Sequence, residues 1–221
     1  MSIFKTKYLL GIIVCILLTG CTYNNIDEIK MKNWKYLNTK NSNLSGDGII
    51  DMKIDSKGNI WVLCSDYNFD YLNKIYPDLH IEAFKIPFSD SISTYFKSAN
   101  VIAIDGQDRI WVGARTSPFY CLENNSWKKF FFNVNFSEVS AMAFDEKNNL
   151  WFGSPYNGLF NNISDSTLVW NHLNSSIPSP EVIKLLVKKS DEVFYFTNQS
   201  PPIIGSKYRL TYFDGNNFKV L

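Results

Sequence analysis

The sequence predicts an all-β fold, and three observations carry that prediction: a repeated motif, a second aromatic series with a similar interval, and turn residues between short apolar runs. The motif is an acidic residue, a polar turn and an apolar run with a central aromatic residue. It occurs at residues 55–62, 105–113 and 145–153, with a weaker copy at 188–196. Its aromatic residues, spaced by 50, 40 and 43 positions, are Trp61, Trp111, Trp151 and Phe194. Intervals of this size are typical of a repeat architecture.

A second aromatic series runs in parallel with the first. Its members are spaced by 50, 43, 43 and 48 positions and are Trp34, Phe84, Trp127, Trp170 and Phe218. Each repeat divides into four short runs, as in "ANVIAIDG", "RIWVGA", "FYCLEN" and "SWKKFFF". Val, Ile, Phe, Tyr and Trp fill the runs, while Asp, Asn, Gly and Ser fill the gaps, which is typical of strands joined by tight turns. Each repeat is therefore expected to form one four-stranded antiparallel sheet.

The run Ile60-Trp61-Val62-Leu63 indicates how these sheets are arranged. A strand with one exposed face would alternate apolar and polar residues, whereas this run is apolar throughout. Both faces must therefore be covered, as they are when sheets stack radially around an axis in a β-propeller. The aromatic residues of the first series are expected to be the structural core of the repeat, as wedges between neighbouring blades.

About four blades are expected, at residues 48–88, 97–133, 138–174 and 181–221, within a repeat region that covers residues 32–221. Closed propellers have about four to eight blades. In a closed ring, the leading strand at Trp34 and the strand at Phe218 would compete for one outer edge. An open partial propeller would instead expose apolar end faces and favour self-association through open blade edges. The sequence leaves both arrangements open.

The first residues have the form of a bacterial lipoprotein signal peptide. Lys5 and Lys7 precede an apolar run over residues 8–18, and Leu-Thr-Gly stands directly before Cys21. The run is shorter than the about 20 apolar residues that span a bilayer. Leu-Thr-Gly-Cys resembles the lipobox, which implies a signal peptide over residues 1–20, lipidation of Cys21, a short tether over residues 21–31, and a lipid anchor in the cell envelope, by default at the outer membrane. An ordinary secretory signal with an incidental cysteine is the alternative.

The motif D-x-x-x-N-I/L-W-V/F-G resembles the two-component-regulator propeller repeat, which is found in periplasmic sensors of hybrid kinases and in bacterial lipoproteins. The segment "NWKYLNTKNSNLSGDGIIDMKID", residues 33–55, is also similar to the passage between blades in that family. The resemblance covers residues 32–221 and implies a propeller. It implies little about activity, because propellers carry many unrelated functions.

Composition argues against several classes of function. A net charge of +1 with scattered basic residues gives no basis for nucleic-acid binding. The sequence has two histidines and no Cys/His cluster, which disfavours a zinc site and a Ser-His-Asp triad. It also disfavours the site of streptogramin lyases, which are propellers too and need a His/Glu constellation with a bound cation. No catalytic residue, metal or cofactor is assigned. We expect Cys64 and Cys121 to be buried free thiols, with a disulfide as the alternative in an exported protein.

Ligand binding is the function expected for this fold. The loops after the second strand of each blade gather on one face of a propeller, and here they carry Tyr67, Arg115, Phe119 and Tyr156. Aromatic planes beside a guanidinium are typical of a carbohydrate or peptide groove, although exposed aromatic residues can also simply cover blade ends. We therefore expect a lipid-anchored module that binds a glycan, peptide or protein, with a sensing or glycan-related role. The alternatives are a propeller-type lyase or carboxylate-based glycoside-active enzyme, and a degenerate, truncated copy of a larger propeller sensor.

Overall fold

The structure is a computed structural model, and the residues that it describes are 35–66, 69–88, 99–115, 119–132, 134–163, 166–171, 173–198 and 208–221. All strands lie in one compact unit, Leu37–Leu221. The expected signal peptide, the lipidation site at Cys21, the tether over residues 21–31 and the leading strand at Trp34 lie outside the described residues.

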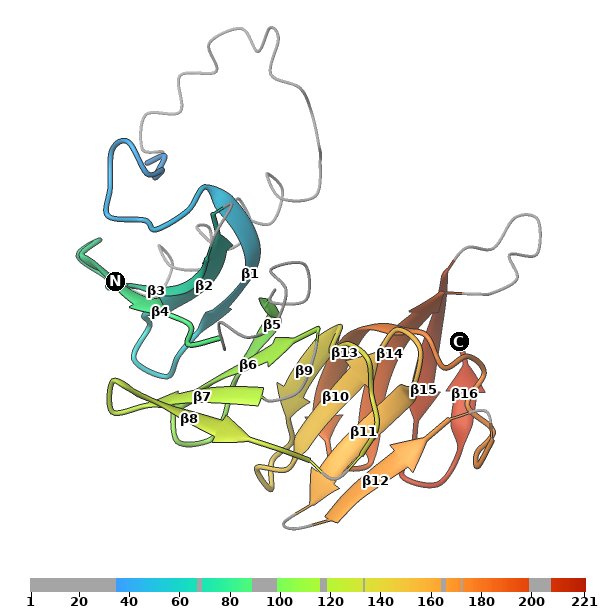
Figure 1. The fold of residues 1–221 in the computed structure, drawn as a ribbon. Helices are drawn as coiled ribbons and strands as arrows, with labels where there is room; N and C mark the ends of the chain where they lie inside the picture. The colour runs from blue at the N-terminus through green and yellow to red at the C-terminus, as the bar shows by residue number, and fades with distance from the viewer. Residues whose placement is uncertain are drawn as a thin grey trace, which may run out of the picture. The chain divides into compact units, whose positions relative to one another are not determined.

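The described residues form four antiparallel sheets of four strands each (Figure 1). Blade 1 contains β1 (Gly48–Ile54), β2 (Ile60–Ser65), β3 (Asp70–Ile75) and β4 (Ile81–Lys85). Blade 2 contains β5 (Ala99–Ile104), β6 (Ile110–Ala114), β7 (Phe119–Glu123) and β8 (Ser126–Phe130). Blade 3 contains β9 (Ala141–Phe144), β10 (Leu150–Ser154), β11 (Gly158–Ile163) and β12 (Ser166–Trp170). Blade 4 contains β13 (Val182–Lys189), β14 (Glu192–Asn198), β15 (Tyr208–Phe213) and β16 (Phe218–Val220).

This architecture confirms the predicted all-β propeller of four four-stranded blades. Within each blade the strands pair in chain order, as in β1-β2-β3-β4. Across the described ranges there is no helix long and apolar enough to span a membrane.

The first strand of each blade packs against the first strand of the next. β1 contacts β5, β5 contacts β9, and β9 contacts β13. Among the described residues, no packing of comparable extent joins β13 to β1. The described blades therefore form an open partial propeller, in which blade 1 and blade 4 each keep one face that no other described blade covers.

A separate apolar core fills each of the three junctions between blades. Trp61 lies in the core between blades 1 and 2, Trp111 between blades 2 and 3, and Trp151 between blades 3 and 4. Their exposed fractions are 6%, 7% and 2%. Phe194 is only half-buried, because no blade in the described residues packs on its face of blade 4, and its ring contacts Tyr212 with centroids 4.9 Å apart. The three tryptophans are thus wedges between blades, whereas the fourth aromatic residue lies on an end face.

A buried aspartate fixes the turn before each tryptophan wedge. In blade 3, Asp145 Oδ1 accepts hydrogen bonds from the backbone N–H groups of Lys147 and Asn149, at 2.9 and 2.8 Å. Its Oδ2 accepts the indole N–H of Trp151 at 3.1 Å. The equivalent turns of blades 1 and 2 repeat these contacts, with indole hydrogen bonds of 3.0 and 2.9 Å. The acidic residue of the motif therefore sets both the turn and the orientation of the wedge.

The turn of blade 1 predicts acid sensitivity at Asp55. Burial by itself raises the pKa of this carboxyl group, but hydrogen bonds from Asn59, Trp61 and the backbone outweigh burial and hold the pKa below its ordinary value of 3.8. Since the folded-state pKa lies below the unfolded one, the carboxylate stabilises the fold above about pH 4, and this contribution is lost as the pH falls through the lowered pKa. Urea titrations should show a steeper loss of unfolding free energy below about pH 4 in the parent than in Asp55→Asn. Equal slopes in the two chains would contradict this role.

Candidate ligand-binding site

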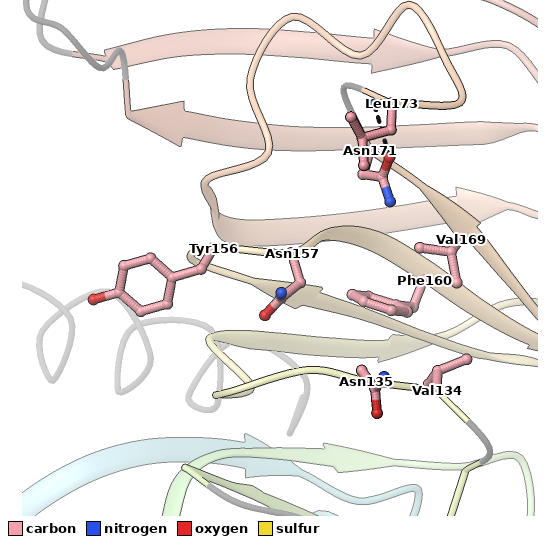
Figure 2. A pocket seen from close by; sticks show the side chains of 8 residues that line it. All are labelled: Val134, Asn135, Tyr156, Asn157, Phe160, Val169, Asn171 and Leu173. Carbon is pink, nitrogen blue, oxygen red and sulfur yellow. Dashed lines mark hydrogen bonds between the residues drawn. The ribbon is translucent and has the colours of Figure 1, made fainter.

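A cavity of about 430 Å³ opens beside blade 3 (Figure 2). Its volume lies in the range of about 300–1,000 Å³ that is usual for small-molecule sites. The walls come from the segment between β8 and β9, the turn between β10 and β11, the strands β11 and β12, and the residues that follow β12. The lining residues are Val134, Asn135, Tyr156, Asn157, Phe160, Val169, Asn171 and Leu173.

Phe160 forms an apolar wall of this cavity. Its side chain is 1% exposed and stacks on Phe152, with ring centroids 4.6 Å apart and an interplanar angle of 3°. Phe136 contacts both rings, at centroid distances of 5.4 Å from Phe152 and 6.1 Å from Phe160. Val134 and Val169 pack against the same core. Because closely packed rings have few alternative arrangements, this wall is preformed rather than induced by a ligand.

Asn157 is held in one orientation by three hydrogen bonds to its side-chain oxygen. Oδ1 accepts the backbone N–H of Ser137 at 3.0 Å, the Ser137 hydroxyl at 3.1 Å and the Ser154 hydroxyl at 3.0 Å. A backbone N–H can only donate, so it fixes which end of the amide is the oxygen. Among the described residues Nδ2 has no acceptor, and it is the donor that Asn157 offers to a ligand.

Asn171 has a similar arrangement at another part of the lining. Its Oδ1 accepts the backbone N–H of Leu173 at 2.8 Å, which is the dashed line in Figure 2. Its backbone N–H donates to Asn174 Oδ1 at 2.9 Å, so the turn holds the residue at both ends. No described residue accepts from Nδ2, and Figure 2 shows this nitrogen pointing toward the cavity. The site therefore presents two neutral, oriented amide donors.

Tyr156 supplies a flat apolar surface at the rim. Its side chain is 66% exposed, and Figure 2 shows the ring extending away from the other lining residues. It stands in the tight turn between β10 and β11, where Gly158 has a φ of +104°. Among the described residues, the lining contains no Asp, Glu, Lys, Arg or His. The arrangement is suited to an uncharged ligand that carries oxygen acceptors beside an apolar face.

The structure places the four predicted ligand contacts in different surroundings. Tyr156 lines the cavity. Arg115 is not part of the lining, and its Nε lies 3.8 Å from Glu138 Oε1. The prediction for Phe119 is wrong, because this side chain is 1% exposed and lies in the core between blades 2 and 3. Tyr67 lies outside the described residues.

Sequence reasoning missed the asparagines of the cavity. Asn157 and Asn171 follow strands, where asparagine is ordinarily interpreted as a turn residue. Both do serve turns, through their oxygens. The only signal in the sequence was the aromatic neighbour at Tyr156. An Asn beside an exposed aromatic residue in a loop can bind a ligand as well as stabilise a turn.

Reactive groups are sparse in the part of the chain that the structure describes. No group of three or more His, Cys, Asp or Glu side chains there is placed to hold a metal ion. Cys64 and Cys121 are free and buried, as expected from the sequence. Burial raises the pKa of each thiol to about 12. Both thiols are therefore protonated at neutral pH and are packing residues rather than nucleophiles.

Comparison with known proteins finds likeness in structure. No family model matches the chain, and no curated protein matches it. The extracellular domain of a hybrid two-component system from B. thetaiotaomicron is 15% identical with a TM-score of 0.62, over 85% of this chain and 26% of that one. A second such domain from the same organism is 14% identical with a TM-score of 0.56, over 83% and 22% of the two chains.

An enzyme is also similar in structure. Virginiamycin B lyase from Staphylococcus aureus, in a catalytically inactive form with quinupristin, is 12% identical with a TM-score of 0.59, over 78% of this chain and 54% of that one. This chain spans about half the length of the lyase and about a quarter of the sensor domains. At these identities the likeness shows the fold alone. It confirms that the chain is similar in fold to the extracellular propellers of hybrid two-component systems.

Proposed function

We propose that this chain is an exported, lipid-anchored binding module that holds a neutral glycan in the cavity beside blade 3. The observation that carries this proposal is the lining, whose described residues supply two oriented amide donors, one exposed tyrosine ring and no charged side chain. Hydroxyl and ring oxygens of a sugar accept hydrogen bonds from amides, and its C–H face packs on an aromatic ring. An extended peptide would need donors and acceptors in alternation, whereas the oriented groups of Asn157 and Asn171 are donors.

The location rests on two independent observations. The Leu-Thr-Gly-Cys sequence at the N-terminus resembles a lipobox, and the similar sensor structures are extracellular domains. Both support a position outside the cytoplasm. Lipidation of Cys21 and the outer-membrane location are part of the proposal.

Replacing Tyr156 with alanine is expected to weaken glycan binding by about 5- to 13-fold, because loss of an aromatic contact costs about 1–1.5 kcal/mol. The ring is exposed, so the fold should keep its stability. Tyr156→Phe keeps the aromatic face and should bind within about threefold of the parent, an energy difference below about 0.7 kcal/mol. The probe is an array of neutral and acidic oligosaccharides, followed by titration calorimetry of any neutral oligosaccharide that binds.

Phe131→Ala is the matched control for this test. Phe131 is 71% exposed and lines a different hollow, of about 710 Å³, that also contains Trp111 and Phe144. Its removal should leave binding unchanged. The proposal is wrong if no neutral oligosaccharide binds, or if Tyr156→Ala binds as tightly as the parent. Loss of binding in Phe131→Ala alone would place the ligand in the other hollow.

A further inference from the structure

Blade 4 ends in an exposed apolar face. Alternate residues of β14 point to opposite sides of the sheet, so Val193 and Tyr195 are buried against blade 3 while Phe194 and Phe196 lie on the other side. Phe196 is 47% exposed, and Leu186, which pairs with Phe194, is 65% exposed. We define the end face of blade 4 by its apolar side chains, Leu186, Phe194, Phe196, Tyr208, Leu210 and Tyr212; the exposed Lys184 pairs with Phe196 on the same side.

The same positions are covered in the other blades. Phe194 is the counterpart of Trp61, Trp111 and Trp151, which the following blade buries to 7% exposure or less. The counterpart of Phe196 in blade 1 is Leu63, whose exposed fraction is 0%. In this chain, therefore, the partner that covers such a face is always the neighbouring face of another blade.

Blade 1 carries the complementary face at the other end of the chain. In the core between blades 1 and 2, blade 2 contributes Ile104, which pairs with Ile110 in the adjacent strand. The counterpart of Ile104 in blade 1 is Ile54, which pairs with Ile60 in the same way. Ile54 is 40% exposed, because no blade precedes it in the described residues. We define the free face of blade 1 as Met52, Ile54, Ile60, Val62, Ile75 and Ile81. Leu44 of the leading segment already packs with Val62, Ile75 and Ile81, which are buried, so the accessible part of this face is Met52, Ile54 and Ile60.

The segment that leads into blade 1 is built like the passage from blade 3 into blade 4. In the passage from blade 3 into blade 4, the backbone carbonyl of Asn171 accepts the N–H of Asn174 at 3.3 Å and the hydroxyl of Ser175 at 2.8 Å. In the segment that leads into blade 1, the carbonyl of Asn38 accepts the N–H of Asn41 at 3.3 Å and the hydroxyl of Ser42 at 2.6 Å. The first passage ends with Ile177 in the junction core, and the second ends with Leu44 packed on the free face of blade 1. Blade 1 is thus entered as though another blade preceded it.

We propose that the end face of blade 4 packs on the free face of blade 1 in a second copy of this chain. The contact continues the blade-on-blade packing that occurs three times within the chain. The described blades of each copy have one face of each kind, so two copies cover all four faces when two such head-to-tail contacts close a ring. That ring has eight blades, which lies within the range of about four to eight in closed propellers. This proposal does not depend on glycan binding.

Cross-linking of introduced cysteines in the full chain tests the contact. Leu186 of β13 and Ile54 of β1 lie on first strands, which meet at every junction within the chain. Two chains are co-expressed: one carries Leu186→Cys and a first affinity tag, and the other carries Ile54→Cys and a second tag. The envelope fraction is then treated with a short bis-maleimide. We expect a cross-linked product of two chains that carries both tags. Cys64 and Cys121 are buried in both chains, and the parent treated alone measures the background.

In a matched control, the cysteine of blade 4 is moved to an exposed apolar position in another blade. Leu168→Cys lies in β12 of blade 3, where the side chain is 46% exposed, and it should give no two-tag product with Ile54→Cys. Phe196→Lys added to the Leu186→Cys chain should reduce the product at least about tenfold, because a charge at a desolvated apolar contact costs more than about 1.4 kcal/mol. Leu168→Lys in its place should leave the yield unchanged.

Two results would overturn the proposal. If a single chain with both Leu186→Cys and Ile54→Cys cross-links within itself and no two-tag product forms, blade 4 closes on blade 1 of its own copy. If neither product forms although a maleimide reagent labels both cysteines, the two faces do not meet at all.

Discussion

Replacing Trp151 with alanine is expected to lower the free energy of unfolding by about 3–5 kcal/mol. Trp151 is 2% exposed and lies in the core between blades 3 and 4. Its ring stacks on Trp170 with centroids 5.5 Å apart and an interplanar angle of 8°, and it contacts Phe213 at 6.0 Å. The substitution empties that core and removes the indole donor from buried Asp145. Urea denaturation of the two chains measures the difference.

Phe194→Ala is the internal control for the wedge. Phe194 occupies the same position of the repeat, but it is half-buried on the end face of blade 4. At low protein concentration, where copies are separate, we expect Phe194→Ala to lower the free energy of unfolding by about 1–2 kcal/mol. The loss is smaller than at Trp151 because folding buries less apolar surface of a ring that is only partly covered. Equal losses at Trp151 and Phe194 would contradict the assignment of the tryptophans as wedges between blades.

Replacing Gly158 with alanine is expected to cost about 3–5 kcal/mol and to distort the cavity. The φ of Gly158 is +104°, a backbone conformation that a side chain opposes. A Cβ atom there would also lie 2.1 Å from the backbone oxygen of Trp170. Relief of that clash must move the end of β12, which leads directly into Asn171. We therefore expect a loss of stability by urea denaturation and a loss of oligosaccharide binding in the same variant.

Gly58→Ala separates conformational strain from the clash. Gly58 has a φ of +81°, but a Cβ atom there would meet no atom within 4 Å. The expected cost is about 1–2 kcal/mol, from strain alone. Because Gly58 lies in the turn between β1 and β2, far along the chain from the cavity residues, oligosaccharide binding should be unchanged. The account of Gly158 fails if the two alanine variants lose the same stability.

The blade and its repeat could be predicted from the sequence alone. Turn residues and strand-forming runs are local signals, and the aspartate six residues before each tryptophan makes the same hydrogen bonds in blades 1, 2 and 3. The unbroken apolar run around Trp61 predicted that both faces of its strand are covered. Blade 2 covers the face of Trp61 and Leu63, whereas Val62 on the other face packs in a core with Leu44 of the segment that leads into blade 1. The buried state of Cys64 and Cys121 was predictable for the same reason, since both stand within such strands.

The binding site and the ends of the propeller depend on packing between repeats and could not be predicted from the sequence. Phe119 is a loop-adjacent aromatic residue in the sequence, but its position at the start of β7 directs it into a junction core. Asn157 and Asn171 appear as turn residues, and their amide donors come to one cavity only because β11 and β12 bring the ends of two hairpins together. The exposure of Phe194 depends on whether another blade follows, which is a property of packing between repeats. Local patterns encode a repeat, whereas a site that joins several turns, or a face without a neighbour, exists only once the repeats are packed.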